Sequence, residues 1–305
     1  RDPEDDEEIL IRHDNVFGTA EEDARRRDFT INGLFYDIER DEVIDYVGGL
    51  PDLEQRTLRT IGDPDIRFRE DPIRILRAIK FSARLDLTIA ADTYRALLAH
   101  VSELPKAAAP RLLEEFYRLL RGGAAASSLR LMLDTGVAAT VAPSLAKLYG
   151  ATMGPGSVAW RVLAQLDSFV HDKHIEDLPQ TRFRHQRPRV APAHPDESPK
   201  APPTNSLLLA ALLLPFVAEH EADNEHAPDQ GLAAEVLLRP LVIELGVSRR
   251  DAERAHQILI AQNRLSPHRP RRTRSMSLVK RDFFPEALVL YRIGQGVHGR
   301  TDADE

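Results

Sequence analysis

Two short segments combine carboxylates with arginines at spacings that could do chemistry. In the first, residues 25–28 (RRRD), three arginines precede an aspartate at the start of an apolar run. An arginine offers a forked set of N–H donors that matches phosphate oxygens, and a neighbouring carboxylate can accept a hydrogen bond from a sugar hydroxyl. Taken alone, such a segment is more often a solvated turn whose ion pairs contribute little.

The second segment is residues 70–77 (EDPIRILR). On a helix, Asp71 and Arg74 share a face, and Arg77 lies one turn further along it. An acceptor and a forked donor held together can read the edge of a base, because the carboxylate accepts from an exocyclic amine while the guanidinium donates to a ring nitrogen. The structural alternative is a helix capped by Asp71, with Pro72 in its first turn and a weak ion pair between Asp71 and Arg74.

Charge is segregated along the chain. Residues 1–8 (RDPEDDEE) hold six acids, whereas residues 264–281 (RLSPHRPRRTRSMSLVKR) hold seven Lys or Arg and no acid. The net charge of −7 therefore does not decide which partner the protein binds.

Composition excludes several classes of protein. With 42% hydrophobic and 29% charged residues among 305, the chain can bury a core and is not wholly disordered. The absence of cysteine excludes a disulfide scaffold, thiol catalysis and cysteine-based metal sites. The longest apolar run, residues 207–217, is too short to span a bilayer, and the acidic N-terminus is unlike a signal peptide, so we expect a cytoplasmic protein without a membrane partner.

The elements that must position the charged segments are a hairpin and a series of helices. Alternating apolar residues predict strands at 29–38 and 43–47, and Gly62-Asp63-Pro64 predicts a turn into helices. From about residue 69 the apolar spacing is helical, as in Ile73, Leu76 and Ile79. Further helices are predicted at 92–101, 109–121, 127–135, 156–170, 205–222, 231–245, 249–263 and 283–294.

Taken together in order, these segments resemble one known family. The runs RRRDFTINGLFYD and DYVGGLPDLEQRTLRTIGDPDIRFREDPIRILRAIKF resemble the class II tRNA nucleotidyltransferases and bacterial poly(A) polymerases over residues 14–85. The resemblance implies a mostly α fold, in which a partial α/β head with a β-hairpin precedes an all-helical neck, body and tail. The implied domains are 1–62 (head), 63–123 (neck), 124–170 (body helices), 171–204 (a Pro- and Arg-rich disordered linker) and 205–305 (body and tail helices).

The resemblance also implies which residues bind the nucleotide. In that family the Arg-Arg-Asp motif binds the triphosphate and ribose, and the EDxxR motif on the neck helix reads the base as a protein template. Mapped onto this chain, the nucleotide-binding set is Arg26, Arg27, Asp28, Asn32, Glu70, Asp71, Arg74 and Arg77.

The implied substrates are ATP and the 3′ end of an RNA. The basic stretch suits binding of RNA phosphates, through Arg269, Arg271, Arg272, Arg274, Lys280 and Arg281; its alternative is a solvated basic loop. Residues 14–24 look more like the poly(A) polymerase branch, with mRNA or small RNA as partner. The CCA-adding branch, with tRNA as partner, is the alternative, and a non-catalytic RNA-binding adaptor is another.

One family feature has no counterpart in this sequence. The family's catalytic segment is a GGxVRD turn followed by a GxDxD strand whose carboxylates bind Mg²⁺ for nucleotidyl transfer. This chain contains neither motif, and its acids at 2–8 lack the placed geometry that Mg²⁺ requires. We therefore expect an N-terminally incomplete family member without a metal site, inactive by itself.

Overall fold

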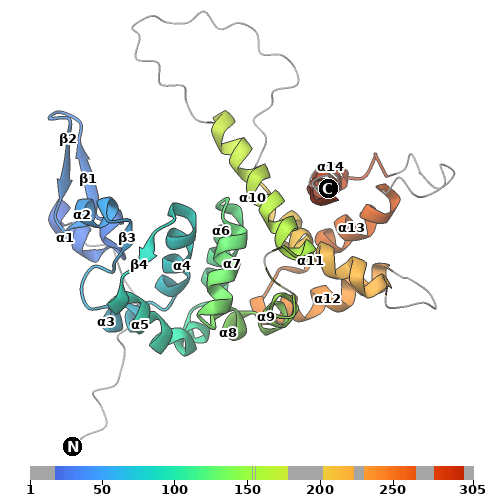
Figure 1. Cartoon of the computed structure of the whole chain (residues 1–305), viewed down its shortest axis with the longest axis horizontal. Helices are drawn as coiled ribbons and strands as arrows, with labels where there is room; N and C mark the ends of the chain where they lie inside the picture. The colour runs from blue at the N-terminus through green and yellow to red at the C-terminus, as the bar shows by residue number, and fades with distance from the viewer. Residues whose placement is uncertain are drawn as a thin grey trace, which may run out of the picture. The chain divides into compact units, whose positions relative to one another are not determined.

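A computed structural model describes residues 18–152, 154, 156–177, 202–222, 230–265 and 278–298 (Figure 1). Over these ranges the chain is mostly helical, with two small two-stranded sheets, which confirms the predicted fold class. It divides into two compact units. Unit 1 comprises residues 1–120, 126–153 and 239–249, and unit 2 comprises 121–125, 154–238 and 250–305. The domain borders expected at 62, 123, 170 and 204 stay predictions.

The elements follow one another along the chain without a repeated pattern. In order they are α1 (Ala20–Arg26), η1 (Thr30–Asn32), β1 (Leu34–Asp37), β2 (Glu42–Asp45), α2 (Gly49–Glu54), β3 (Thr57–Leu58), α3 (Pro64–Glu70), α4 (Ile73–Leu85), β4 (Thr88–Ile89), α5 (Ala91–His100), η2 (Val101–Lys106), α6 (Ala109–Arg121), α7 (Ala125–Asp134), α8 (Val137–Val141), α9 (Pro143–Gly150), α10 (Val158–Asp177), α11 (Asn205–Ala222), α12 (Gln230–Leu245), α13 (Arg249–Leu265) and α14 (Phe284–His298).

The predicted hairpin is present, but its first strand is shorter than the sequence pattern indicates. β1 and β2 pair antiparallel from Leu34 opposite Asp45 to Asp37 opposite Glu42. The predicted strand at 29–38 is wrong over its first half, where η1 forms a 3-10 turn. Side-chain bonds explain the turn, because the Thr30 hydroxyl donates to Asp52 at 2.7 Å and the side chain of Asn32 donates back to Asp28 at 2.8 Å.

A short stretch of pairing ties residues 28–30 to the chain that precedes α3. Phe29 forms an isolated antiparallel bridge with Thr60, and the amide of Ile61 donates to the carbonyl of Asp28 at 3.0 Å. Gly62 then takes a positive φ of 81°, as the predicted turn requires, and α3 begins at Pro64. The RRRD segment is therefore fixed beside the start of the helical region.

Helices α3 and α4 form the part of unit 1 that matters most for the site. Asp63 caps α3 by accepting from the amide of Asp65 at 2.9 Å. The apolar residues predicted to line one face of α4, Ile73, Leu76 and Ile79, are buried. Its polar residues are covered as well, including Arg74, which is 7% exposed. A charged side chain buried to this degree needs partners, and the site described below supplies them.

Unit 2 is a set of packed helices. α10 packs against α11 and α14, and Arg254 of α13 pairs with Asp282 and Glu286. α10 continues to Asp177, so the expected linker at 171–204 begins inside a helix; residues 178–201 of it lie outside the described ranges. The error arose because the proline-rich segment begins only after this helix ends.

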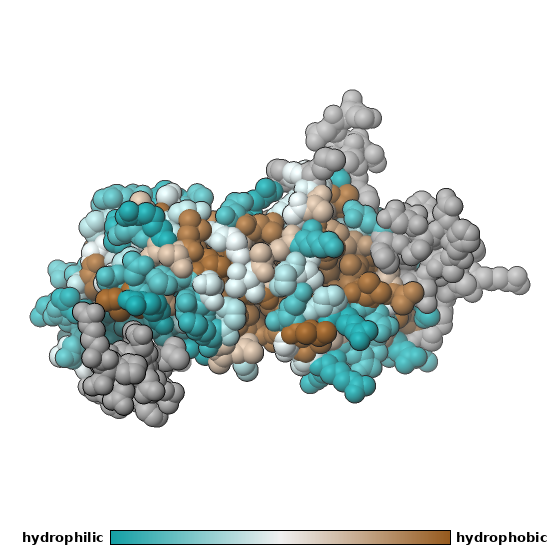
Figure 2. Space-filling model, turned by 90° about the horizontal axis from the view of Figure 1, so that it is seen from below, coloured by the Kyte–Doolittle hydropathy of each residue, from teal (hydrophilic) through white to brown (hydrophobic). Residues whose placement is uncertain are grey.

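The surface and helix lengths complete the description. The face shown in Figure 2 is mostly hydrophilic over the N-terminal end of the chain, on the left, where the hairpin and α3 lie. Of the helices described, none is both long and apolar enough to cross a membrane.

Candidate functional site

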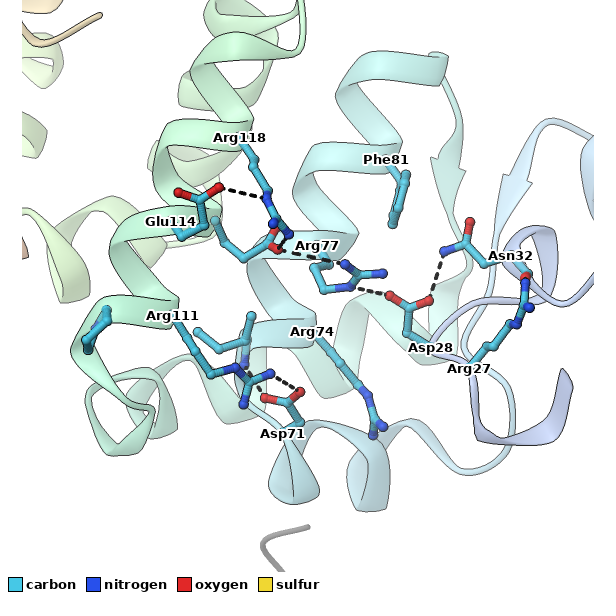
Figure 3. A pocket seen from close by; sticks show the side chains of 13 residues that line it. Arg27, Asp28, Asn32, Asp71, Arg74, Arg77, Phe81, Arg111, Glu114 and Arg118 are labelled. Atoms are coloured by element: carbon cyan, nitrogen blue, oxygen red, sulfur yellow. Dashed lines mark hydrogen bonds and ion pairs between the residues drawn. The ribbon is translucent and has the colours of Figure 1, made fainter. Parts of the chain in front are cut away.

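A cavity of about 830 Å³ lies within unit 1, between the RRRD segment, α4 and α6 (Figure 3). Its size falls in the range typical of small-molecule sites, but its walls are unusually charged. The residues that line it are Arg27, Asp28, Asn32, Asp71, Ile73, Arg74, Arg77, Phe81, Pro110, Arg111, Glu114, Glu115 and Arg118.

Asp28 is the buried acceptor of one wall. One carboxylate oxygen accepts from its neighbour's amide and from Asn32, while the other accepts from Nε of Arg77 at 2.5 Å. Burial alone raises the pKa of Asp28, but these donors outweigh it and hold the pKa below its ordinary value. Asp28 is therefore an anion whose orientation is fixed from three sides.

Arg27 lies beside Asp28 and is held by local contacts. Its Nη2 donates to Asp23 at 2.8 Å and its Nη1 to the carbonyl of Asn32 at 2.5 Å. The guanidinium also stands over the ring of Phe35, 4.7 Å from the centroid. Arg27 thus presents a cation at a fixed place on the cavity wall.

Arg74 lies in the same cavity and is anchored from behind. Its Nη1 donates to the carbonyl of Arg67 and to Oε2 of Glu70, both at 3.0 Å. Glu70 itself does not line the cavity. This carboxylate holds the guanidinium in place.

Asp71 pairs with a residue that the sequence did not suggest. Its Oδ2 accepts from Nη2 of Arg111 at 2.8 Å, and its Oδ1 accepts from the amide of Ile73 at 3.3 Å. The expected capping role is therefore present. The alternative ion pair with Arg74 is replaced by pairs of Arg74 with Glu70 and of Asp71 with Arg111, because Arg111 on α6 reaches across the cavity mouth.

The far wall is a cluster of charges around Glu115, which is 5% exposed. Glu115 accepts from Lys80 and from Arg118 at 2.7 Å each, and Arg77 lies 3.8 Å from it. Burial opposes ionisation of Glu115, but Lys80 and the two arginines hold its pKa below the ordinary value. Burial likewise lowers the pKa of Lys80, and Glu115 counters that effect. Glu115 thus joins α4 to α6.

This arrangement suits an anionic ligand that also carries hydrogen-bonding edges. Five arginines reach the cavity against four carboxylates, and Phe81 adds an aromatic face. The carboxylates do not suit Mg²⁺, because Asp28, Asp71 and Glu115 are each engaged by cations. Elsewhere in the described ranges, too, no group of three or more His, Asp or Glu side chains could hold a metal ion.

The cavity brings together six of the residues predicted to bind the nucleotide: Arg27, Asp28, Asn32, Asp71, Arg74 and Arg77. Arg26 and Glu70 lie outside its lining. Of the predicted RNA-binding residues, Lys280 and Arg281 are exposed and belong to unit 2. The others, Arg269, Arg271, Arg272 and Arg274, fall outside the described residues.

Sequence reasoning missed one whole wall of the cavity. Arg111, Glu114, Glu115 and Arg118 are spaced three and four residues apart on α6, so they share a face. The apolar residues of α6, such as Leu112 and Phe116, are buried. This charged stripe was a detectable signal, but nothing local indicated that it faces α4.

Comparison with known proteins gives matches over two parts of the chain. Residues 3–59 match the family model described as the poly A polymerase head domain. Residues 86–148 match the model described as a probable RNA and SrmB-binding site of polymerase A. The second match covers the whole of α6.

Curated relatives come from both branches of this family. Poly(A) polymerase I of Salmonella typhi is 37% identical over 160 residues, which cover 52% of this chain and 33% of the relative. The CCA-adding enzyme of Geobacillus thermodenitrificans is 41% identical over 129 residues, which cover 42% of this chain and 31% of the relative. The chain thus aligns with about a third of the length of these relatives.

Solved structures share the fold. The Bacillus stearothermophilus CCA-adding enzyme in complex with CTP aligns with a TM-score of 0.56 at 21% identity, covering 94% of this chain and 60% of that one. A CCA-adding enzyme in complex with ATP aligns with a TM-score of 0.52 at 19% identity, covering 92% and 58%. Through its matched segments, 3–59 and 86–148, the chain belongs to the family of poly(A) polymerases and CCA-adding nucleotidyltransferases.

Proposed function

We propose that this chain binds ATP and the 3′ end of an RNA as part of a template-independent nucleotidyltransferase of the poly(A) polymerase type. One observation carries the proposal. The cavity unites the two sequence motifs, with Arg27 and Asp28 on one side and Asp71 and Arg74 on another. The protein's partners would be ATP and a general RNA such as mRNA or a small RNA.

The roles of the cavity residues follow from their donors and acceptors. Asp71 accepts from the exocyclic amine of adenine, and Arg74 donates to a ring nitrogen. Asp28 accepts from a ribose hydroxyl, with Arg77 and Asn32 fixing its orientation. Arg27 binds phosphate oxygens. Because Arg74 and Asp28 are already held by protein groups, little ordering is required when the nucleotide binds.

Metal chemistry has no place among these residues. Mg²⁺ supports nucleotidyl transfer in the family, but the described carboxylates do not fit it, so we assign to this chain only binding and orientation of the substrates. From the sequence we retain the prediction that the chain alone does not transfer nucleotides, since it contains neither GGxVRD nor GxDxD.

CCA addition to tRNA is the second candidate. The observation in its favour is the similarity to the CCA-adding enzyme of Geobacillus thermodenitrificans, whose identity of 41% is higher than that of the poly(A) polymerases, although over a shorter stretch. A CCA-adding protein binds CTP as well as ATP, whereas a poly(A) polymerase prefers ATP. Nucleotide preference therefore separates the two.

The first experiment measures binding of ATP and CTP to the full chain by calorimetry. We expect ATP to bind and CTP to bind at least about tenfold more weakly, a difference of about 1.4 kcal/mol. Equal affinities would favour CCA addition. Binding of oligo(A) or tRNA without binding of either nucleotide would favour the RNA-binding adaptor and sink the proposal.

The second experiment tests transfer in the same preparation. The chain is incubated with Mg²⁺, ATP, CTP and either an oligo(A) primer or tRNA lacking its CCA end, and primer length is followed on a gel. We expect no extension from the chain alone. Robust extension would show that the residues needed for metal binding are present after all.

A further inference from the structure

Arg67 of α3 makes contacts that neither motif accounts for. Its side chain leaves α3 and reaches the end of α1, where Nη2 donates to three successive carbonyls. The distances are 3.4 Å to Arg25, 3.0 Å to Arg26 and 2.5 Å to Arg27. These carbonyls belong to the last turn of α1 and to the residue that follows it, so one cation holds the backbone that leads directly to Asp28.

The other nitrogen of the same guanidinium faces the base-reading side. Nη1 of Arg67 donates to Oε2 of Glu70 at 3.0 Å, and that oxygen also accepts from Nη1 of Arg74 at 3.0 Å. Arg74 in turn donates to the backbone carbonyl of Arg67. Arg67, Glu70 and Arg74 therefore form a closed set of hydrogen bonds.

The placement of Arg67 is costly for stability. Its side chain is 14% exposed, and burial together with the positive charge of Arg74 lowers its pKa despite the nearby carboxylates. Its Nε is buried without a hydrogen-bond partner among the described residues. An apolar side chain of similar volume would fill the space without this desolvation cost. Packing alone therefore does not explain the guanidinium, whereas its fork does, since its two ends hold two different parts of the cavity wall.

We propose that Arg67 is a positioning residue that fixes the distance between the ribose-and-phosphate side of the cavity, at Arg27 and Asp28, and the base-reading side, at Arg74. This proposal rests on the proposed function. A nucleotide has a set spacing between its base, ribose and phosphates. Both sides of the cavity can engage it at once only if their own spacing is held.

The test uses the full chain and three ligands: ATP, CTP and ribose 5-triphosphate, which lacks the base. In Arg67→Met, both the base-dependent and the base-independent parts of binding should weaken. We expect about a tenfold loss of ATP affinity, a fall in the ATP-to-CTP affinity ratio toward one, and weaker binding of ribose 5-triphosphate. In Glu70→Gln only the ATP-to-CTP ratio should fall, because Glu70 contacts Arg74 but no carbonyl of α1.

Arg69→Met is the matched control. Arg69 lies on the same helix, is exposed, and donates only within that helix, to the carbonyl of Asp65 at 3.4 Å. We expect it to leave all three affinities unchanged. Thermal unfolding of each variant shows whether it is folded, and Arg67→Lys serves if Arg67→Met is not, because a lysine keeps the charge but cannot hold both sides with one nitrogen.

The outcomes separate the two proposals. If the unmodified chain binds neither ATP nor ribose 5-triphosphate, the proposed function fails. If it binds them and a folded Arg67 variant keeps the same ATP-to-CTP ratio and the same affinity for ribose 5-triphosphate, the positioning role of Arg67 is overturned. A uniform loss of stability without a change in the ratio would also overturn it.

Discussion

Helices α4 and α6 line the same cavity but hold their arginines in different ways. On α4 the side chain of Arg74 is 8% exposed and that of Arg77 29% exposed. On α6 the corresponding values are 60% for Arg111 and 50% for Arg118. The α4 arginines are fixed by buried carboxylates and carbonyls, whereas the α6 arginines remain largely in water.

The difference follows from where each helix lies. α4 is buried on most of its surface, so each of its cations must be paired inside the protein. α6 buries only its apolar face and leaves its charged stripe toward the cavity and solvent. A fixed wall suits discrimination between bases, because the donors cannot move to fit the wrong one. An exposed wall suits phosphates, which are bound largely by charge.

The largest effect should come from breaking the link between the two walls. Glu115→Ala leaves Lys80, Arg77 and Arg118 without their shared carboxylate, so we expect a loss of about 3–5 kcal/mol in the free energy of unfolding. Urea denaturation measures it. Glu114→Ala is the control, because Glu114 is exposed and pairs with Arg118, and it should cost less than about 1 kcal/mol. Equal losses in the two variants would contradict the assignment of Glu115 as the link.

A smaller effect should separate the walls in binding. Arg74→Met is expected to reduce the ATP-over-CTP preference by about 1–3 kcal/mol, since a fixed donor to the base is lost. Arg111→Met should weaken both nucleotides together and by no more than about 1 kcal/mol, since its pair with Asp71 is solvated. Calorimetry with ATP and CTP measures both. The contrast between a fixed and an adaptable wall is refuted if Arg111→Met alters base preference as much as Arg74→Met.

The smallest effect concerns pH. The folded-state pKa of Asp28 and of Glu115 lies below the ordinary value, so each contributes stability that is present above about pH 4 and is lost as pH falls through the lowered value. We expect the free energy of unfolding to fall in that acid range. Asp28→Asn should make the fall shallower. An unchanged acid slope in this variant would show that the pairing with Arg77 does not stabilise the fold.

Several features of the site follow from the sequence alone. The residue types in RRRD and EDPIR, and the helical spacing of Asp71, Arg74 and Arg77, predict a cluster of donors and acceptors. The turn at residues 62–64 and the helix at 109–121 are predicted at the observed places. These features depend on glycine and proline backbone preferences and on a regular apolar period, which are properties of neighbouring residues.

Only the tertiary structure decided which charges meet. Arg77 pairs with Asp28 across 49 residues, Arg111 with Asp71 across 40, and Arg67 reaches the carbonyl of Arg27 across 40. Likewise, Thr30–Asn32 (η1) turns where the alternation predicts a strand, because Asp52 binds Thr30 from 22 residues away. Local propensity is weak compared with a buried hydrogen bond, and the partner in such a bond is set by packing. The sequence therefore determines the chemical groups, and the fold determines how they are paired.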